Sequence, residues 1–128
     1  MRVLETVLYA EDLTAAHKFY TGILALEEIS FNDERSLFLR CDQSVLIIFK
    51  ASKTLVHDSN VPPHGTTGPG HMAFAATEEE IEKWRIKLSE SSIEIIDEVH
   101  WKNGAHSIYF NDPGGNVLEF ATPNLWGF

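Results

Sequence analysis

The order of hydrophobic and polar residues divides the chain into two successive blocks that predict the same elements in the same order. In the first block, residues 3–10 predict a strand, and Asp12 opens a segment whose apolar residues recur at helical spacing. Three runs rich in β-branched and aromatic residues follow at 26–31, 35–41 and 44–50, with turn residues between them. They predict an antiparallel meander.

The second block repeats this order after a polar loop rich in proline and glycine. Residues 71–76 predict a strand, and Thr77 with Glu80 three positions later forms a capping box at the start of a helix. The apolar face of that helix consists of Ile81, Trp84 and Leu88. Three further strands are predicted at 93–99, 105–111 and 116–121.

The two blocks also match in their letters, which indicates an internal duplication. RSLFLR at 35–40 aligns with HSIYFN at 106–111, and SVLIIF at 44–49 aligns with NVLEFA at 116–121. The sequence therefore predicts an α+β fold made of tandem βαβββ modules.

The predicted modules belong to one domain that covers residues 1–128, because each half is too short to enclose a stable core alone. We expect module one at about 1–51, a hinge loop at about 52–68, module two at about 69–122 and a C-terminal tail at 123–128.

The charge of the chain narrows the classes of partner. Its 128 residues include 10 Lys and Arg and 19 Asp and Glu, a formal net charge of −9, which disfavours nucleic acid and anionic membrane surfaces. The longest apolar run, from Val45 to Phe49, is much shorter than the roughly 20 residues of a membrane span, and the first residues are too acidic for a signal peptide. With Cys41 as the single cysteine, these features predict a cytoplasmic protein.

Three ionisable residues lie in strands whose neighbouring positions are apolar on both faces: Glu5, His71 and Glu119. A strand of this kind is expected to be covered on both sides, where a carboxylate without a partner is costly. Local explanations exist for each residue. Glu5 can lie at an open sheet edge, His71 can be a satisfied core histidine, and Glu119 can pair with Arg35 or Arg40.

The duplication favours a common site over three separate explanations. Glu5 and His71 occupy the first strand of their copies, and Glu119 lies in the last strand of the second copy. Two carboxylates and one imidazole suit a divalent metal ion and leave coordination positions open for water or substrate.

Three segments carry a resemblance to a known family: LETVLYAEDLTAAHKFYTGILAL, GPGHMAFA and SIYFNDPGGNVLEFATP. They resemble the vicinal oxygen chelate superfamily, which contains glyoxalase I, the bleomycin- and fosfomycin-resistance proteins and the extradiol dioxygenases. The most specific piece is YFNDPGGNVLE. The resemblance implies a cleft-like mixed sheet with helices on its outer face, a divalent metal ion (Mn, Fe, Zn, Ni or Mg) and a homodimer.

The family's ligand positions can be transferred to this chain residue by residue. The first falls on Glu5, seven positions before Asp12, where the family usually has a histidine. The third falls on His71 and the fourth on Glu119, whereas the second falls on Ile47, which cannot bind a metal. The resemblance therefore implies a site with three protein ligands. Such a site is more similar to those of the dioxygenases and fosfomycin-resistance enzymes than to glyoxalase I, which uses four.

Other residues are candidates for substrate contacts. Tyr109, ten positions before Glu119, resembles the catalytic tyrosine of the dioxygenases in its spacing, although it can equally be a half-buried aromatic with Phe38 as its counterpart. His64 in the loop and Trp101 are predicted to bind substrate. The alternatives are a solvated loop histidine and a core or dimer contact.

Two further features give no functional prediction. His100 and His106 have no partner that the sequence identifies. The acidic run at 78–82 is interpreted as a solvated first helical turn that the helix dipole favours.

Two functions are compatible with these observations. The leading hypothesis is a small metal-dependent enzyme of the glyoxalase or dioxygenase type, acting on a small molecule with adjacent oxygens. The alternative is a metal-free small-molecule binding protein of the bleomycin-resistance type, which Ile47 and the unusual Glu5 favour.

Overall fold

The computed structural model describes residues 1–57 and 60–128, so two residues of the predicted hinge loop lie outside the description. The chain forms two compact units, which we consider separately. Unit 1 contains Met1–Gly70 and Pro113–Asn116, and unit 2 contains His71–Asp112 and Val117–Phe128.

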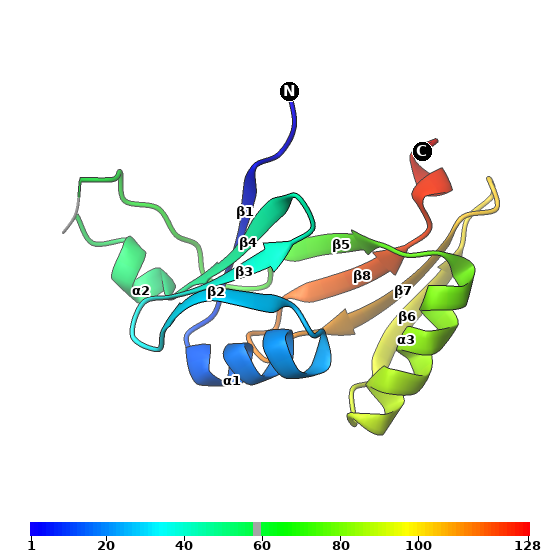
Figure 1. Cartoon of the computed structure of the whole chain (residues 1–128), viewed down its shortest axis with the longest axis horizontal. Helices are drawn as coiled ribbons and strands as arrows, with labels where there is room; N and C mark the ends of the chain where they lie inside the picture. Colours follow the sequence, from blue (N-terminus) through cyan, green and yellow to red (C-terminus); the bar gives the residue numbers. More distant parts are fainter. Residues whose placement is uncertain (58–59) are drawn as a thin grey trace. The chain divides into compact units, whose positions relative to one another are not determined.

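Unit 1 contains a mixed four-stranded sheet with the strand order β1-β4-β3-β2 (Figure 1). Strand β1 is parallel to β4, and the other neighbouring strands are antiparallel. The elements in chain order are β1 (Glu5–Tyr9), α1 (Leu13–His17), the π-helix η1 (Lys18–Ile23), β2 (Glu27–Asn32), β3 (Ser36–Cys41), β4 (Ser44–Phe49) and α2 (Ala51–Thr54).

The first helix begins where the sequence predicts but changes its winding. The Asp12 side chain caps α1 by accepting a hydrogen bond from the Ala15 amide at 2.9 Å. From Lys18 the chain winds as a π-helix, and the Thr21 hydroxyl donates to the His17 carbonyl at 2.6 Å. Such side-chain bonds compete with the regular helical ladder. Hydrophobic spacing alone therefore predicts the helical segment but not its wider turn.

Unit 2 contains a sheet of the same topology, with the order β5-β8-β7-β6 and a parallel pair β5–β8. Helix α3 lies across one face of this sheet (Figure 1). Its elements are β5 (His71–Ala75), α3 (Glu78–Glu90), β6 (Ile95–His100), β7 (His106–Asn111), β8 (Val117–Ala121) and the 3₁₀ turn η2 (Pro123–Leu125). The predicted α+β fold of βαβββ modules is confirmed.

The predicted capping box begins α3. The Thr77 hydroxyl accepts from the Glu80 amide at 3.2 Å, and the Glu80 carboxylate accepts from the Thr77 amide at 2.7 Å. Ile81 and Leu88 of the helix are fully buried. The fully buried side chains of the sheet in unit 2 include Ile108, Phe110 and Leu118.

Strand alternation in unit 2 separates an apolar face from a polar one. On β7, His106, Ile108 and Phe110 share the face that carries α3, so Ser107 and Tyr109 lie on the opposite face. Because Tyr109 pairs directly with Glu119, the glutamate shares that opposite face. The candidate site is therefore on the side of the sheet that α3 leaves uncovered.

Asn116 is a buried polar residue that fastens the β7–β8 loop within unit 1. Its side chain donates to the Tyr9 carbonyl at 3.0 Å and accepts from the Gly70 amide at 2.8 Å. The preceding turn uses Gly115 at a φ of +86°, a conformation that suits glycine.

None of the helices in the described ranges is long and apolar enough to cross a membrane.

Candidate active site

His71 and Glu119 form the polar centre of unit 2. His71 is the first residue of β5, and Glu119 lies in the middle of the adjacent strand β8. The Nε2 atom of His71 is 3.3 Å from Oε2 of Glu119. The Nδ1–H group of His71 donates to the Val117 carbonyl at 3.0 Å. This bond places a proton on Nδ1, and Nε2 on the other side of the ring faces the carboxylate.

Glu119 has an unsatisfied oxygen. The residue is only 5% exposed, and within the described part of the chain its Oε1 atom has no hydrogen-bond partner. A buried acceptor without a partner loses its hydrogen bonds to water and forms none within the protein, which costs free energy. The donor set of a carboxylate and an imidazole lone pair therefore fits a bound cation.

Tyr109 adjoins this pair. Its ring is stacked against that of His71, with centroids 6.3 Å apart and an interplanar angle of 30°. Burial, and after it a hydrogen bond to Glu119, raises the pKa of the Tyr109 phenol. The hydroxyl therefore keeps its proton at neutral pH and remains a hydrogen-bond donor.

A cavity of about 640 Å³ opens over these residues within unit 2. Trp101 forms one wall, and its indole N–H is fixed by donation to the Ser107 hydroxyl at 2.9 Å. The Asn103 side chain donates to the Asn124 and Leu125 carbonyls at 3.1 and 3.3 Å, which ties the β6–β7 turn to the C-terminal turn η2. The residues that line the cavity are His71, Trp101, Lys102, Asn103, Tyr109, Glu119, Leu125 and Trp126.

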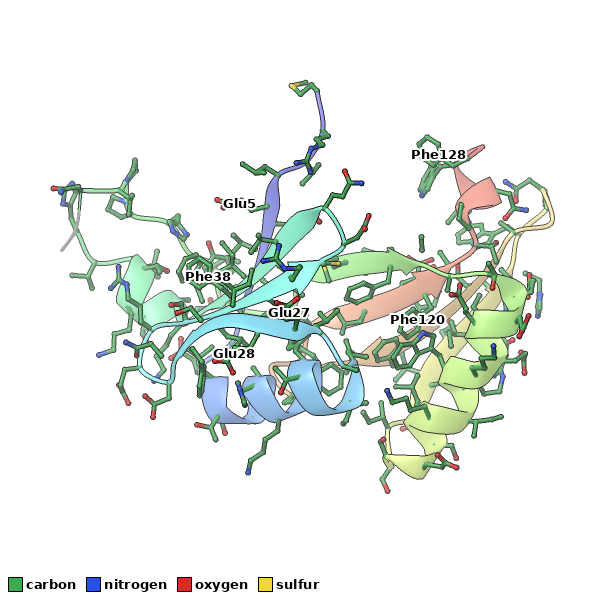
Figure 2. The ribbon with its side chains drawn as sticks, viewed as in Figure 1. Glu5, Glu27, Glu28, Phe38, Phe120 and Phe128 are labelled. Atoms are coloured by element: carbon green, nitrogen blue, oxygen red, sulfur yellow. The ribbon has the colours of Figure 1, made fainter. Side chains whose placement is uncertain are left out.

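Unit 1 has a corresponding but less polar cavity of about 520 Å³. Phe38 pairs with Ile47 as Tyr109 pairs with Glu119, so the buried Ile47 replaces the carboxylate. Glu5 extends from β1 at the edge of this sheet (Figure 2). The cavity is lined by Glu5, Val7, Phe38, Ile47, Phe49, Val61, Pro62, Pro63 and His64.

His64 lies against the apolar wall of the unit 1 cavity. Its Nδ1 atom is hydrogen-bonded to the Tyr9 hydroxyl at 2.7 Å, and its ring meets Phe49 edge to face at 5.0 Å. His64 is exposed and has defined partners. Its predicted role in substrate binding stays a prediction.

The expectation of burial was wrong for two of the three residues, and the open sheet edge given as an alternative for Glu5 holds. Glu5 and His71 are exposed because β1 and β5 are edge strands, whereas Glu119 on an interior strand is buried. Glu119 pairs with His71, and its proposed alternative partner Arg40 instead forms an ion pair with Glu27 at 3.2 Å. An apolar strand pattern therefore does not distinguish an edge strand from an interior one.

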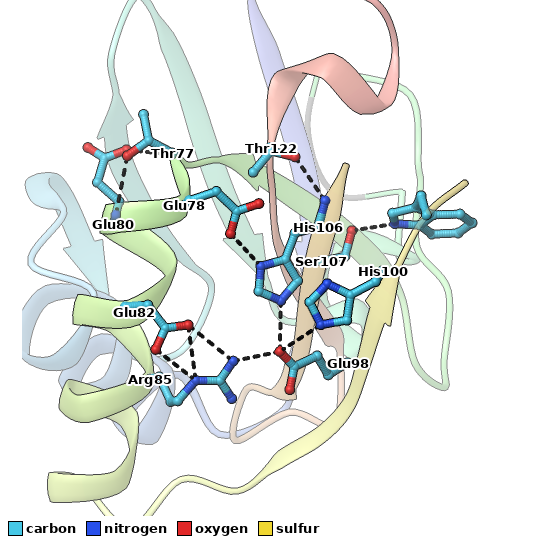
Figure 3. A network of polar contacts seen from close by, with 11 residues as sticks. Thr77, Glu78, Glu80, Glu82, Arg85, Glu98, His100, His106, Ser107 and Thr122 are labelled. Carbon is cyan, nitrogen blue, oxygen red and sulfur yellow. Dashed lines mark hydrogen bonds and ion pairs between the residues drawn. The ribbon is translucent and has the colours of Figure 1, made fainter. Parts of the chain in front are cut away.

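A second polar cluster lies on the α3 side of unit 2, and sequence reasoning missed it. Nδ1 of His106 is 2.7 Å from Glu78 Oε2, and Nε2 is 2.8 Å from Glu98 Oε1 (Figure 3). His106 thus has partners, and Glu78 is not merely solvated. A sequence signal was available in the turn dipeptide Asn103-Gly104. In the structure this turn makes His100 and His106 direct neighbours.

The protonation of His106 reflects these contacts. Burial alone lowers the pKa of the imidazole, but hydrogen bonds to Glu78 and Glu98 outweigh it, so the pKa is raised. Arg85 of α3 also donates to Glu98 at 2.7 Å, and this bond is the main cause of the lowered pKa of Glu98.

Comparison with known proteins places this geometry in context. The family model described as the Glyoxalase/Bleomycin resistance protein/Dioxygenase superfamily matches residues 2–120. The crystal structure of lactoylglutathione lyase from Agrobacterium tumefaciens is 34% identical, covers 99% of this chain and 97% of its own, and has a TM-score of 0.95. No significant match is found among curated protein sequences.

More distant structures share the fold. A glyoxalase/bleomycin resistance protein/dioxygenase from Nocardioides is 21% identical with a TM-score of 0.75, over 95% of this chain and 83% of its own. An integron cassette protein from the metagenome of a Halifax Harbour sewage outfall is 23% identical with a TM-score of 0.74, over 94% of this chain and 97% of its own.

Proposed function

Because the chain belongs to the Glyoxalase/Bleomycin resistance protein/Dioxygenase superfamily, we propose that it is a glyoxalase-type enzyme that binds a small-molecule substrate at a divalent metal ion. The observation that carries the proposal is the buried Oε1 atom of Glu119, which has no hydrogen-bond partner within the described residues and lines a cavity beside His71. A cation at this point would satisfy both that oxygen and the Nε2 lone pair of His71.

The residues that would hold the ion are His71 and Glu119, and we propose Glu5, from the same chain or from a second copy, as the third ligand. Ile47 supplies no donor atom, so the ion keeps positions open for substrate oxygens. Two carboxylates favour harder ions such as Mn, Fe or Mg, although Zn and Ni remain compatible with the imidazole. When bound, the ion supplies Lewis acidity that stabilises negative charge on adjacent substrate oxygens.

The other residues of the cavity would bind and orient the substrate. The Tyr109 hydroxyl holds its proton at neutral pH and can donate it in a hydrogen bond to a substrate oxygen. Trp101, fixed by Ser107, provides a flat apolar wall that excludes water. Lys102 adds a positive charge at the cavity rim for an anionic part of the substrate.

The structure that is 34% identical is a lactoylglutathione lyase, which suggests a substrate of the same kind for this chain. We therefore propose lyase chemistry on a small 2-hydroxyacyl or 2-oxo compound with adjacent oxygens. We also propose a cytoplasmic homodimer that binds neither nucleic acid nor membranes, in keeping with the net charge of −9.

The test combines metal analysis with activity. The untagged full-length protein is purified without chelator and its metal content is measured, and formation of lactoylglutathione from glutathione and methylglyoxal is then followed. We expect one metal equivalent that depends on Glu119, so Glu119→Gln should hold one equivalent less than wild type and should lose activity, because even changes around metal ligands cost about 10–100-fold in affinity or activity. The control is Glu94→Gln, an exposed carboxylate in the loop before β6. Equal metal content and equal activity in wild type and Glu119→Gln would overturn the proposal.

The metal-free alternative is favoured by one observation, the buried Ile47 at the position equivalent to Glu119. If the protein only sequesters a small molecule, a chelator will leave its thermal stability unchanged. Added Mn or Zn that raises the melting temperature of wild type but not of Glu5→Ala would count against this alternative.

A further inference from the structure

The β6–β7 hairpin of unit 2 brings two histidines together on the face opposite the cavity. His100 ends β6 and His106 begins β7, and the two are direct cross-strand partners. Their rings are stacked, with centroids 4.3 Å apart and an interplanar angle of 16°. Because His106 faces α3 whereas Ser107 and Tyr109 face the other side, this pair is separate from the His71 and Glu119 pair.

A carboxylate completes a set of three donors at this place. Glu98 lies two residues before His100 on the same strand, so both side chains extend from the same face of the sheet. Its Oε1 atom is 2.8 Å from Nε2 of His106 and 3.6 Å from Nε2 of His100. One ligand atom from each of the three residues lies within 4.8 Å of the others.

Helix α3 supplies two side chains, Glu78 and Arg85, that hydrogen-bond to these donors. The Glu78 carboxylate holds Nδ1 of His106 at 2.7 Å, which fixes the ring and directs Nε2 toward Glu98 (Figure 3). Histidine ligands in metalloproteins are commonly held by a carboxylate in this manner. Arg85 donates to Glu98 at 2.7 Å and so restricts the carboxylate from the helix side.

From this arrangement we propose a second metal site, formed by Glu98, His100 and His106 and independent of the proposed active site. In the metal-free protein, Nε2 of His106 donates its proton to Glu98. A bound ion takes the place of that proton and is shared by the two imidazoles and the carboxylate. Two imidazoles and one carboxylate select Zn²⁺, Ni²⁺ or Cu²⁺ over Mg²⁺ and Ca²⁺.

The ion would reinforce unit 2 at one of the two edge strands of its sheet. Strand β6 is at the edge of the sheet, and the three ligands connect both strands of its hairpin. Through Glu78 the connection extends to α3. Zn²⁺ binding is therefore expected to raise the melting temperature, since an ion that binds only the folded state stabilises it.

The test is calorimetric titration of Zn²⁺ into the chelator-stripped, untagged full chain, in a Glu119→Gln background that disables the other candidate site. We expect one equivalent to bind. Adding His100→Gln should weaken the affinity at least tenfold. The matched control is His17→Gln, another histidine paired with a glutamate, Glu28, at 2.7 Å.

His100 has 75% of its side chain exposed, so its replacement leaves the core untouched, and circular dichroism will verify the fold. A second comparison tests the positioning role of Glu78. Glu78→Gln should weaken Zn²⁺ binding by about 10–100-fold, whereas Glu79→Gln, whose carboxylate pairs with Lys83 on the helix surface, should not.

Two results would overturn the second site: no Zn²⁺ binding in the Glu119→Gln background, or equal affinity with and without His100→Gln. Neither result bears on the proposed activity, because the differences in metal content and in activity between wild type and Glu119→Gln report on the cavity alone.

Discussion

At the scale of single residues, burial separates the carboxylates that the sequence treats alike. Glu5 and Glu119 both lie among apolar strand residues, yet Glu5 is exposed on an edge strand and Glu119 is 5% exposed on an interior one. Only Glu119 therefore carries a desolvation cost that demands a functional explanation. Cys41 needs no functional explanation. Burial and the neighbouring Asp42 raise the pKa of its thiol, which keeps the thiol protonated and unreactive.

This difference predicts unequal stability effects for two equivalent substitutions. In the presence of a chelator, Glu119→Gln should raise the free energy of unfolding by about 1 kcal/mol. The reason is that burying a neutral amide at this position costs less free energy than burying a carboxylate with an unsatisfied oxygen. Denaturant unfolding monitored by circular dichroism measures this.

Glu5→Gln serves as the control and should change the free energy of unfolding by less than about 0.5 kcal/mol, as expected at an exposed position. If Glu119→Gln destabilises the chelated protein clearly more than Glu5→Gln, the carboxylate contributes a structural ion pair with His71 and the argument from desolvation is wrong.

At the scale of elements, the capping box makes the start of α3 the best-defined local feature of the sequence. Thr77→Ala removes one reciprocal bond and should cost about 1 kcal/mol in the free energy of unfolding. Ser89→Ala, an exposed position in the same helix, is the control and should have little effect. Chemical denaturation compares the two variants.

The capping box also predicts a pH dependence. Its backbone hydrogen bond from Thr77 lowers the pKa of Glu80, so the folded carboxylate stays ionised to lower pH than the unfolded one. The resulting stabilisation is fully present above the unfolded value of about 4.3. It is lost as the pH falls through the folded pKa. Glu80→Gln should lack this component, and unfolding curves between neutral and acidic pH will detect the difference; identical pH profiles would contradict it.

Much of the arrangement of elements could be predicted because it depends on local pattern. Strand and helix order, the meanders and the cap of α3 follow from residue spacing and turn chemistry. The pairing of Tyr109 with Glu119 was also predictable, because the DPGG turn sets the register of the last two strands.

The features that were missed depend on contacts distant in sequence. Glu78 and His106 are 28 residues apart, and no local pattern relates a first-turn glutamate to a histidine of another strand. The exposure of Glu5 depends on which strand lies at the sheet edge. His71 and Glu119 were linked through the duplication and the family resemblance rather than through their own neighbours.

At the scale of the whole molecule, the homodimer remains a prediction. The strongly exposed large apolar side chains of the described residues include Val3, Leu4, Trp126 and Phe128, at 68%, 64%, 78% and 92%. Burial of such residues is a common contribution to subunit association. Light scattering is expected to give twice the 14.4 kDa of one chain, and a monomer that persists at all concentrations would contradict this.

Mixing variants would show whether a site combines two chains. If Glu5 of one copy completes the His71 and Glu119 pair of another, unfolding and refolding Glu5→Gln together with Glu119→Gln should restore part of the activity, because one intact site then forms per mixed dimer. If all ligands come from the same chain, the mixture will stay inactive.

The parallel pairing of the first and last strands in unit 2 has a consequence for the order of synthesis. His71 and Val117 are hydrogen-bonded although 46 residues separate them, so β5 must wait for β8, which is near the C-terminal end of the chain. The α3 helix and the β6–β7 hairpin use shorter-range contacts and can form earlier. The pair His71 and Glu119 is thus assembled only after β8 has been synthesised.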